Sequence, residues 1–256
     1  MDYFNIFDSH AHYDDEQFKD DKDTLLSSFA EGGICGCITC GTNTKNSYAA
    51  IELAEKYPFI YAAVGLHPLD IEDEKKENYI DIFRSLSNHE KVVAIGEIGL
   101  DYHYDSAPRE TQIKVLEEQI ILAKELDLPV IIHDRESHED ILNILKKHKP
   151  KGVVHCFSGS VEMMREVVKL GMYIGLGGAV TFKNAKKPVE VAKEVPSERL
   201  LIETDAPYMT PVPFRGKRND STLIPYTAEK IAEVRNTTAQ EILNITNQNA
   251  KELFGI

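Results

Sequence analysis

Short apolar runs alternate along the chain with longer segments whose apolar residues recur every three or four positions. Such short runs are typical of buried strands, and the longer pattern is typical of helices with one apolar face. The pattern predicts eight strands, at residues 5–12, 34–41, 59–67, 91–99, 128–133, 152–157, 172–178 and 199–205. Helices are predicted at 111–127, 137–148, 161–171, and near 223–235 and 238–253.

This alternation of strand and helix predicts parallel strands that helices cover. Eight units in 256 residues average about 32 residues each, which fits a closed (β/α)₈ barrel. An open, doubly wound sheet is the alternative fold that the pattern allows. No linker, low-complexity tract or repeat interrupts the chain, so residues 1–256 are predicted to form a single domain.

Composition narrows the class of protein. Hydrophobic residues make up 42% of the chain, which excludes a disordered protein, and no apolar run approaches the roughly 20 residues that span a bilayer. The N-terminus lacks a secretory signal pattern, so we expect a cytoplasmic protein that does not bind membranes. The net charge of −13 argues against a protein that coats nucleic acid. It does not exclude an enzyme with a locally positive pocket, because bound divalent metals are large local charges.

The four cysteines are Cys35, Cys37, Cys40 and Cys156. The close spacing of the first three suggests zinc, but strand alternation would place Cys35 and Cys37 on one face and Cys40 on the other. We therefore expect small buried thiols in a reducing compartment and no structural metal at these residues.

Histidines and acidic residues gather where the predicted strands end. The residues at these ends are His10, His12, His67, Glu97, His133, His155, Glu203 and Asp205. Each alone could be a core histidine, a helix cap or one half of an ion pair. The carboxyl ends of barrel strands converge on one mouth, however, so their joint occurrence predicts a metal site there.

The spacing of these residues suggests two ions. His10 and His12 are two apart on a strand and so face the same side, where Asp205 could join them around one ion. His133 and His155 would hold the other, with Glu97 between the two. Paired ions about 3.5–4 Å apart can activate a shared water. Four histidines favour zinc, manganese or iron, whereas magnesium prefers oxygen-rich sites, and the metal's identity stays open.

Several motifs closely resemble the TatD family of metal-dependent hydrolases, within the amidohydrolase-like superfamily. They are D-S-H-A-H at 8–12, G-L-H-P at 65–68, G-E-I-G-L-D-Y at 96–102, I-I-H at 131–133, V-H-C-F-S-G at 154–159, L-I-E-T-D-A-P-Y at 201–208, P-F-R-G-K-R-N at 213–219 and N-A-K-E-L-F-G at 249–255. The resemblance implies a TIM-type barrel and a divalent-metal phosphoesterase, often a deoxyribonuclease with 3′-to-5′ exonuclease action. It also implies the same six metal ligands. Two departures are Tyr13, where the family usually has Leu, and Asp220-Ser221, where Glu-Pro is common.

The remaining candidate residues fit phosphate chemistry. Arg215, Lys217 and Arg218 follow the eighth strand in an otherwise acidic chain and are expected to hold substrate phosphates, although they could be solvated loop charges. His67 could contact a phosphate or the attacking water, or simply pack. Residues 101–104 could orient substrate, but loop packing is favoured.

Two acidic residues of the eighth strand are predicted to act in catalysis, together with Glu97. Asp205 is expected to accept the proton of the attacking water. Glu203 shares its strand face with Asp205 and could support a ligand, act as a helper base or bind a third ion.

We expect a hydrolase of phosphodiester bonds with DNA as its substrate, two divalent ions and no obligate protein partner. The alternative is a hydrolase of carboxylic esters or amides, such as aminoacyl-tRNA esters. Against its cyclic-amidase branch, Glu97 stands where a carboxylated lysine is common in those enzymes. A binding protein that retains the metal site without turnover is a third possibility.

Overall fold

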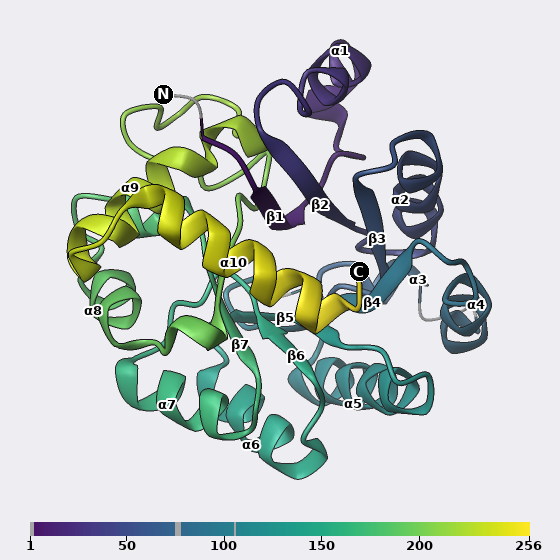
Figure 1. The fold of residues 1–256 in the computed structure, drawn as a ribbon. Helices are drawn as coiled ribbons and strands as arrows, with labels where there is room; N and C mark the ends of the chain where they lie inside the picture. The colour runs from purple at the N-terminus through teal and green to yellow at the C-terminus, as the bar shows by residue number, and fades with distance from the viewer. Residues whose placement is uncertain (1–2, 75–77, 105) are drawn as a thin grey trace.

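The computed structural model describes residues 3–74, 78–104 and 106–256, and shows eight strands surrounded by helices (Figure 1). The strands are β1 (Ile6–Ala11), β2 (Ile34–Cys40), β3 (Ile60–Val64), β4 (Val92–Asp101), β5 (Val130–Arg135), β6 (Gly152–Val154), β7 (Tyr173–Leu176) and β8 (Leu200–Ile202). The helices are α1 (Lys22–Ser27), α2 (Thr44–Lys56), α3 (Ile71–Glu74), α4 (Tyr79–Leu86), α5 (Arg109–Glu125), α6 (His138–His148), α7 (Val161–Lys169), α8 (Lys186–Glu194), α9 (Ile224–Arg235) and α10 (Ala239–Phe254). Short 3₁₀ turns are η1 (Glu16–Phe18), η2 (Gly178–Thr181), η3 (Ser197–Arg199) and η4 (Ser221–Leu223).

The strands pair in parallel and in chain order from β1 to β8. The last strand returns to the first through a parallel bridge between Ala11 and Ala206, and the backbone N–H of Asp205 donates to the carbonyl of His10 at 2.9 Å. This closure confirms the barrel and excludes the open sheet. It also brings the end of β8 directly beside the histidines of β1.

Two apolar layers hold the barrel. One lies between the strands and the surrounding helices, and the other fills the barrel's interior. The interior layer includes Phe7, Ile38, Ile131 and Leu201, and α10 contributes Phe254 to it. Figure 1 shows α10 lying across one end of the barrel, which is the amino end of the strands. Because α10 covers that end, we expect the active site at the opposite end, where the carboxyl ends of the strands meet.

Six of the strands are shorter than the sequence predicts, β4 is longer, and β5 is shifted by two residues toward its carboxyl end. β6, β7 and β8 end at Val154, Leu176 and Ile202, so His155 and Asp205 lie in the turns just beyond them. β4 instead continues past Gly99 to Asp101. Short strand ends leave the backbone free to turn, and Asp205 uses a left-handed conformation with φ of 58°.

Cys37 and Cys40 are divided as strand alternation predicts. Cys37 lies in the layer under the helices, whereas Cys40 lies inside the barrel. The expectation of buried thiols is wrong for Cys35, which is exposed near the start of β2, where the pairing with β1 shifts register. Within residues 3–74, 78–104 and 106–256, no cysteine belongs to a group of side chains placed to hold a metal. In the same ranges, no helix is both long enough and apolar enough to cross a membrane.

Candidate metal centre

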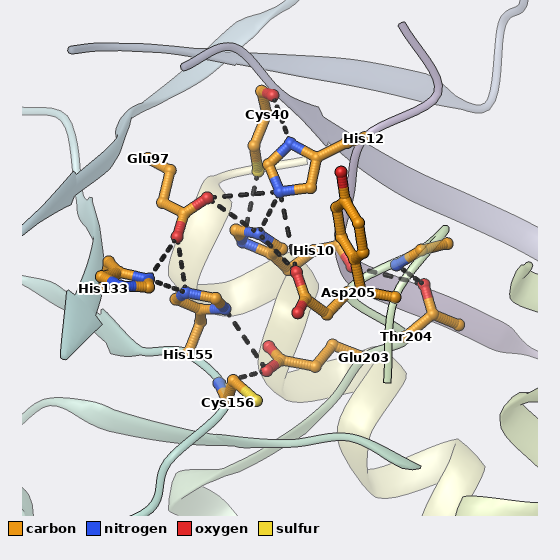
Figure 2. Close-up of polar contacts among 12 residues, drawn as sticks. His10, His12, Cys40, Glu97, His133, His155, Cys156, Glu203, Thr204 and Asp205 are labelled. Atoms are coloured by element: carbon orange, nitrogen blue, oxygen red, sulfur yellow. Dashed lines mark hydrogen bonds and ion pairs between the residues drawn. The ribbon is translucent and has the colours of Figure 1, made fainter. Parts of the chain in front are cut away.

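His10 and His12 present the same ring nitrogen to one point at the mouth (Figure 2). Their Nε2 atoms lie 3.0 Å apart. Oε2 of Glu97 lies 3.4 Å from Nε2 of His10 and 3.2 Å from Nε2 of His12. Oδ1 of Asp205 completes this half, at 3.6 Å and 3.7 Å from the same two nitrogens.

The other half of the centre gathers around the second oxygen of Glu97. Oε1 lies 2.8 Å from Nδ1 of His133 and 2.7 Å from Nε2 of His155. Nε2 of His67 lies 3.5 Å from the same oxygen, so His67 joins Glu97 and His133 in a group that could hold an ion.

Glu97 therefore divides its two oxygens between two pairs of histidines. Its side chain is 4% exposed, and its backbone N–H donates to the carbonyl of Gly41 at 3.0 Å, which ties β4 to the end of β2. One carboxylate oxygen for each pair is the arrangement that a bridging ligand needs. Imidazole and carboxylate donors at this density fit divalent transition ions.

The outer ring nitrogens of the histidines also have neighbours in the protein. Such partners fix the tautomer and orientation of metal-binding histidines. The hydrogen-bonded pairs are His12 Nδ1 with the Cys40 carbonyl at 2.9 Å, His10 Nδ1 with Cys40 Sγ at 3.4 Å, and His133 Nε2 with Asp101 Oδ2 at 3.1 Å. His155 Nδ1 is buried without a hydrogen bond to any residue that the structure describes, and Glu203 Oε1 lies 3.7 Å from it.

The histidines and carboxylates of the centre determine one another's protonation states. Burial opposes ionisation of Glu97, but the surrounding histidines outweigh it and hold its pKa well below the usual range. Burial likewise opposes a charge on His133, yet Asp101 and Glu97 raise its pKa to about 9. His10 behaves differently, because burial and the stacked ring of His155, 3.9 Å away, lower its pKa to about 4. In the absence of metal, protons on some histidines neutralise the carboxylates.

Glu203 lies behind His155 and away from the mouth. Its carboxylate is fully buried and accepts the backbone N–H of Cys156. A side chain at Gly175 would collide with this carboxylate, so glycine is needed there to admit it. Burial raises the pKa of Glu203 to about 7. The geometry supports contact with a ligand rather than with substrate.

Asp101 belongs to the centre, although the sequence favours a role in loop packing for residues 101–104. Its Oδ1 accepts the backbone N–H groups of His103 and Tyr104, at 3.0 and 3.1 Å, and its Oδ2 faces His133. The spacing in the sequence is consistent with this position, because Asp101 is four residues after Glu97 and lies on the same face if the strand continues.

A buried network fixes the position of Asp205. Asp8 accepts the backbone N–H of Thr204 at 3.0 Å and hydroxyl donors from Thr204 and Ser221 at 2.6 and 2.7 Å. Ser221 also donates its N–H to the Tyr13 hydroxyl at 2.9 Å. Tyr13 and Ser221, one from each of the two departures from the expected family pattern (Tyr13 and Asp220-Ser221), therefore contact each other.

The three basic residues after β8 do not share one environment. Arg218 makes a two-pronged ion pair with Asp21, at 2.7 and 2.6 Å, and lies over the ring of Phe18. Arg215 and Lys217 are exposed, and each lies over a phenylalanine ring. Arg218 thus holds the loop against η1, and the other two remain open to solvent.

Comparison with known proteins gives consistent matches over almost the whole chain. The model of the family described as TatD related DNase matches residues 7–255. The chain is 48% identical to the uncharacterized metal-dependent hydrolase YabD of Bacillus subtilis, over 98% of this chain and 99% of that protein. It is 34% identical to the 3′-5′ ssDNA/RNA exonuclease TatD of Salmonella typhimurium, over 98% and 99% of the two chains. The crystal structure of the TatD homologue YjjV of Escherichia coli superposes with a TM-score of 0.92 at 36% identity, covering 98% of each chain.

Proposed function

The chain belongs to the TatD family of metal-dependent hydrolases, and from this premise we propose that it hydrolyses phosphodiester bonds in DNA, removing nucleotides from the 3′ end. The observation that carries the proposal is the division of the Glu97 oxygens between two histidine pairs, at 2.7–3.4 Å. A paired-ion centre suits phosphodiester hydrolysis, because it can stabilise both the attacking and the leaving oxygen.

Six residues would hold two divalent ions, which could be zinc, manganese or magnesium. They are His10, His12 and Asp205 for one ion, His133 and His155 for the other, and Glu97 for both. When bound, such ions polarise the phosphoryl group and lower the pKa of water.

We assign the proton-accepting role to Asp205. Its side chain is 17% exposed, against 4% for Glu97, so it is the more open of these two carboxylates to water and substrate. Burial opposes its ionisation, but His12, His10 and His155 outweigh burial and lower its pKa. The Asp205 carboxylate is therefore ionised at neutral pH and can take a proton from the attacking water.

Glu203 and His67 would support this reaction in different ways. Glu203 touches the back of His155 and so acts as a positioning residue. Nδ1 of His67 accepts the backbone N–H of Leu69 at 3.2 Å, which places the ring proton on Nε2. That proton points toward the centre, where Glu97 Oε1 lies 3.5 Å away. In this tautomer Nε2 would donate to a substrate phosphate oxygen and would not bind an ion.

Nucleic acid as the substrate rests on two further observations. The relative from Salmonella typhimurium is named as an exonuclease of single-stranded DNA and RNA. Arg215 and Lys217 are exposed cations beyond β8 in a chain of net charge −13. Such local cations can hold the phosphates that flank the scissile bond.

A matrix of metals and substrates tests the proposal. Protein reconstituted with Zn²⁺, Mn²⁺ or Mg²⁺ would be incubated with end-labelled single- and double-stranded DNA, RNA, a chromogenic phosphodiester and a carboxylic ester. We expect stepwise shortening of DNA from the 3′ end, lost in Asp205→Asn and retained in Asp134→Asn, whose carboxylate pairs with His138 outside the centre. DNA left intact with every metal, or preferential cleavage of the carboxylic ester, would contradict the proposal.

A further inference from the structure

Cys40 contacts both histidines of the β1 pair through two different atoms (Figure 2). Its backbone carbonyl lies 2.9 Å from Nδ1 of His12, and its Sγ lies 3.4 Å from Nδ1 of His10. We propose that Cys40 is a positioning residue that fixes the tautomers of His10 and His12, and thereby the affinity of the ion they hold. The inference rests on the metal centre of the proposed function but not on its substrate.

The tautomers follow from hydrogen-bonding chemistry. A carbonyl only accepts, so Nδ1 of His12 must carry the ring proton and leave the Nε2 lone pair free. A thiol can donate or accept, and a metal-binding Nε2 on His10 requires that Sγ accept from Nδ1–H. Both histidines can then turn Nε2 lone pairs toward one ion. Without an ion, the 3.0 Å between these nitrogens is a hydrogen-bond distance, and His10 with its proton on Nδ1 would be the acceptor.

The position of Cys40 depends on the barrel. It is the last residue of β2, fully buried, and in register with Ala63 of β3. The next carbonyl, of Gly41, accepts the N–H of Glu97 at 3.0 Å. Two consecutive residues at the end of β2 thus contact three of the predicted ligands.

The two histidine pairs differ in the chemistry of their outer partners. His133 has the carboxylate of Asp101 at 3.1 Å, and His155 has that of Glu203 at 3.7 Å. The partners of His10 and His12 are a thiol and a carbonyl. Removing the thiol would leave Nδ1 of His10 without this contact, while the ring still stacks on His155 at 3.9 Å. The ring would keep its position, but either of its two nitrogens could then carry the proton.

The test measures Zn²⁺ binding by competition with a chelator, in the full chain. Cys40→Ala is expected to weaken one of the two ions by about 10- to 100-fold and leave the other unchanged, which is the usual effect of losing such a partner. Cys40→Ser, which keeps an acceptor, should retain most of the affinity. Ile38→Val is the matched control, since it removes volume from the same interior layer and an isoleucine side chain makes no hydrogen bond to a histidine. Cys40→Val, which keeps the volume without a strong acceptor, replaces the alanine variant if that fails to fold.

A second measurement distinguishes a change in the His10 tautomer from a loss of packing around Cys40. Imidazole ¹⁵N NMR of the metal-free chain should show His10 protonated at Nδ1 in the wild type and in Cys40→Ser, and as a mixture of tautomers in Cys40→Ala. Wild-type Zn²⁺ affinity for both ions in Cys40→Ala, or an equal loss in Ile38→Val, would overturn the inference. A chain that binds Zn²⁺ in this pattern but leaves DNA intact would contradict only the proposed function.

Discussion

Asp101 places one carboxylate oxygen 3.1 Å from Nε2 of His133, while Nδ1 of the same ring lies 2.8 Å from Glu97. The two carboxylates therefore grip opposite nitrogens of one histidine. An ion can occupy only the Nδ1 side, because Asp101 also accepts two backbone N–H groups and is held behind the ring. This contact determines which nitrogen of His133 is available to metal.

Replacing Asp101 with Asn should move the proton of His133 from Nε2 to Nδ1, the nitrogen that faces the metal centre. The amide oxygen can keep the backbone N–H groups of His103 and Tyr104, which turns the NH₂ toward Nε2 of His133 and moves the ring proton to Nδ1. We expect the affinity of one ion to fall by about 10- to 100-fold. Zn²⁺ competition measures it, with Asp134→Asn as the control carboxylate–histidine pair. Equal losses in both variants would indicate a general effect on β5.

Metal binding should release protons at neutral pH. Although burial lowers it, the pKa of His133 is raised to about 9 by Asp101 and Glu97, so the metal-free ring is protonated at pH 7. A histidine must be neutral to bind a metal ion, so Zn²⁺ affinity should rise as the pH rises from 7 toward 9. Calorimetry in buffers of different ionisation enthalpy counts the protons. A heat that does not depend on the buffer would contradict this assignment.

The same raised pKa affects the stability of the metal-free chain. Its contribution is fully present below the ordinary histidine value of 6.5 and is lost as the pH rises through about 9. Saturating metal should remove this dependence between pH 6.5 and about 9, because the metal-bound ring carries no proton there.

Tyr13 and Ser221 should be energetically coupled. Tyr13→Leu leaves the buried N–H of Ser221 without its acceptor. Ser221→Pro removes that N–H and also the hydroxyl that lies 2.7 Å from the Tyr13 oxygen and donates to Asp8. Each change should cost about 1–3 kcal/mol of unfolding free energy, because it orphans a buried polar group. The double variant should cost less than the sum of the two, by about 0.5–3 kcal/mol. Urea unfolding of the three variants measures the coupling, and additive costs would show that the contact is energetically silent.

The basic loop should affect polymer binding and not the metal centre. Neutralising Arg215 and Lys217 is expected to weaken binding of single-stranded DNA and to flatten its salt dependence by about 0.7 log–log units for each lost phosphate contact. Turnover of a small phosphodiester should change far less. Adding Arg218→Ala should lower thermal stability, because this residue ties the loop to Asp21. Equal losses on both substrates would show that the loop shapes the catalytic pocket instead.

The sequence predicts the barrel and the convergence of the ligands because both follow from one rule. Apolar runs separated by helices predict parallel strands, and the carboxyl ends of such strands meet at one mouth. His10, Glu97 and His133 could therefore be grouped although they are far apart in the chain.

The partners behind the ligands could not be predicted in the same way. Cys40 reaches His10 because β1 and β2 pair in a particular register, which the hydrophobic pattern does not specify. Arg218 pairs with Asp21 across 197 positions of sequence, and nothing local distinguishes it from Lys217. The hydrophobic pattern also does not define where a strand ends: it stops at Gly99, whereas β4 continues to Asp101.

The central claim is that Glu97 bridges two ions, and metal content tests it most directly. Wild-type and Glu97→Ala chains would be reconstituted with Zn²⁺, passed through a desalting column and assayed by mass spectrometry for zinc per chain. The fold should survive the substitution, as circular dichroism would show, because the buried residues Val92, Val93 and Ile95 of β4 are unchanged. We predict two ions in the wild type and none in Glu97→Ala, since one carboxylate serves both histidine pairs. A folded Glu97→Ala chain that retains two ions would contradict the bridge.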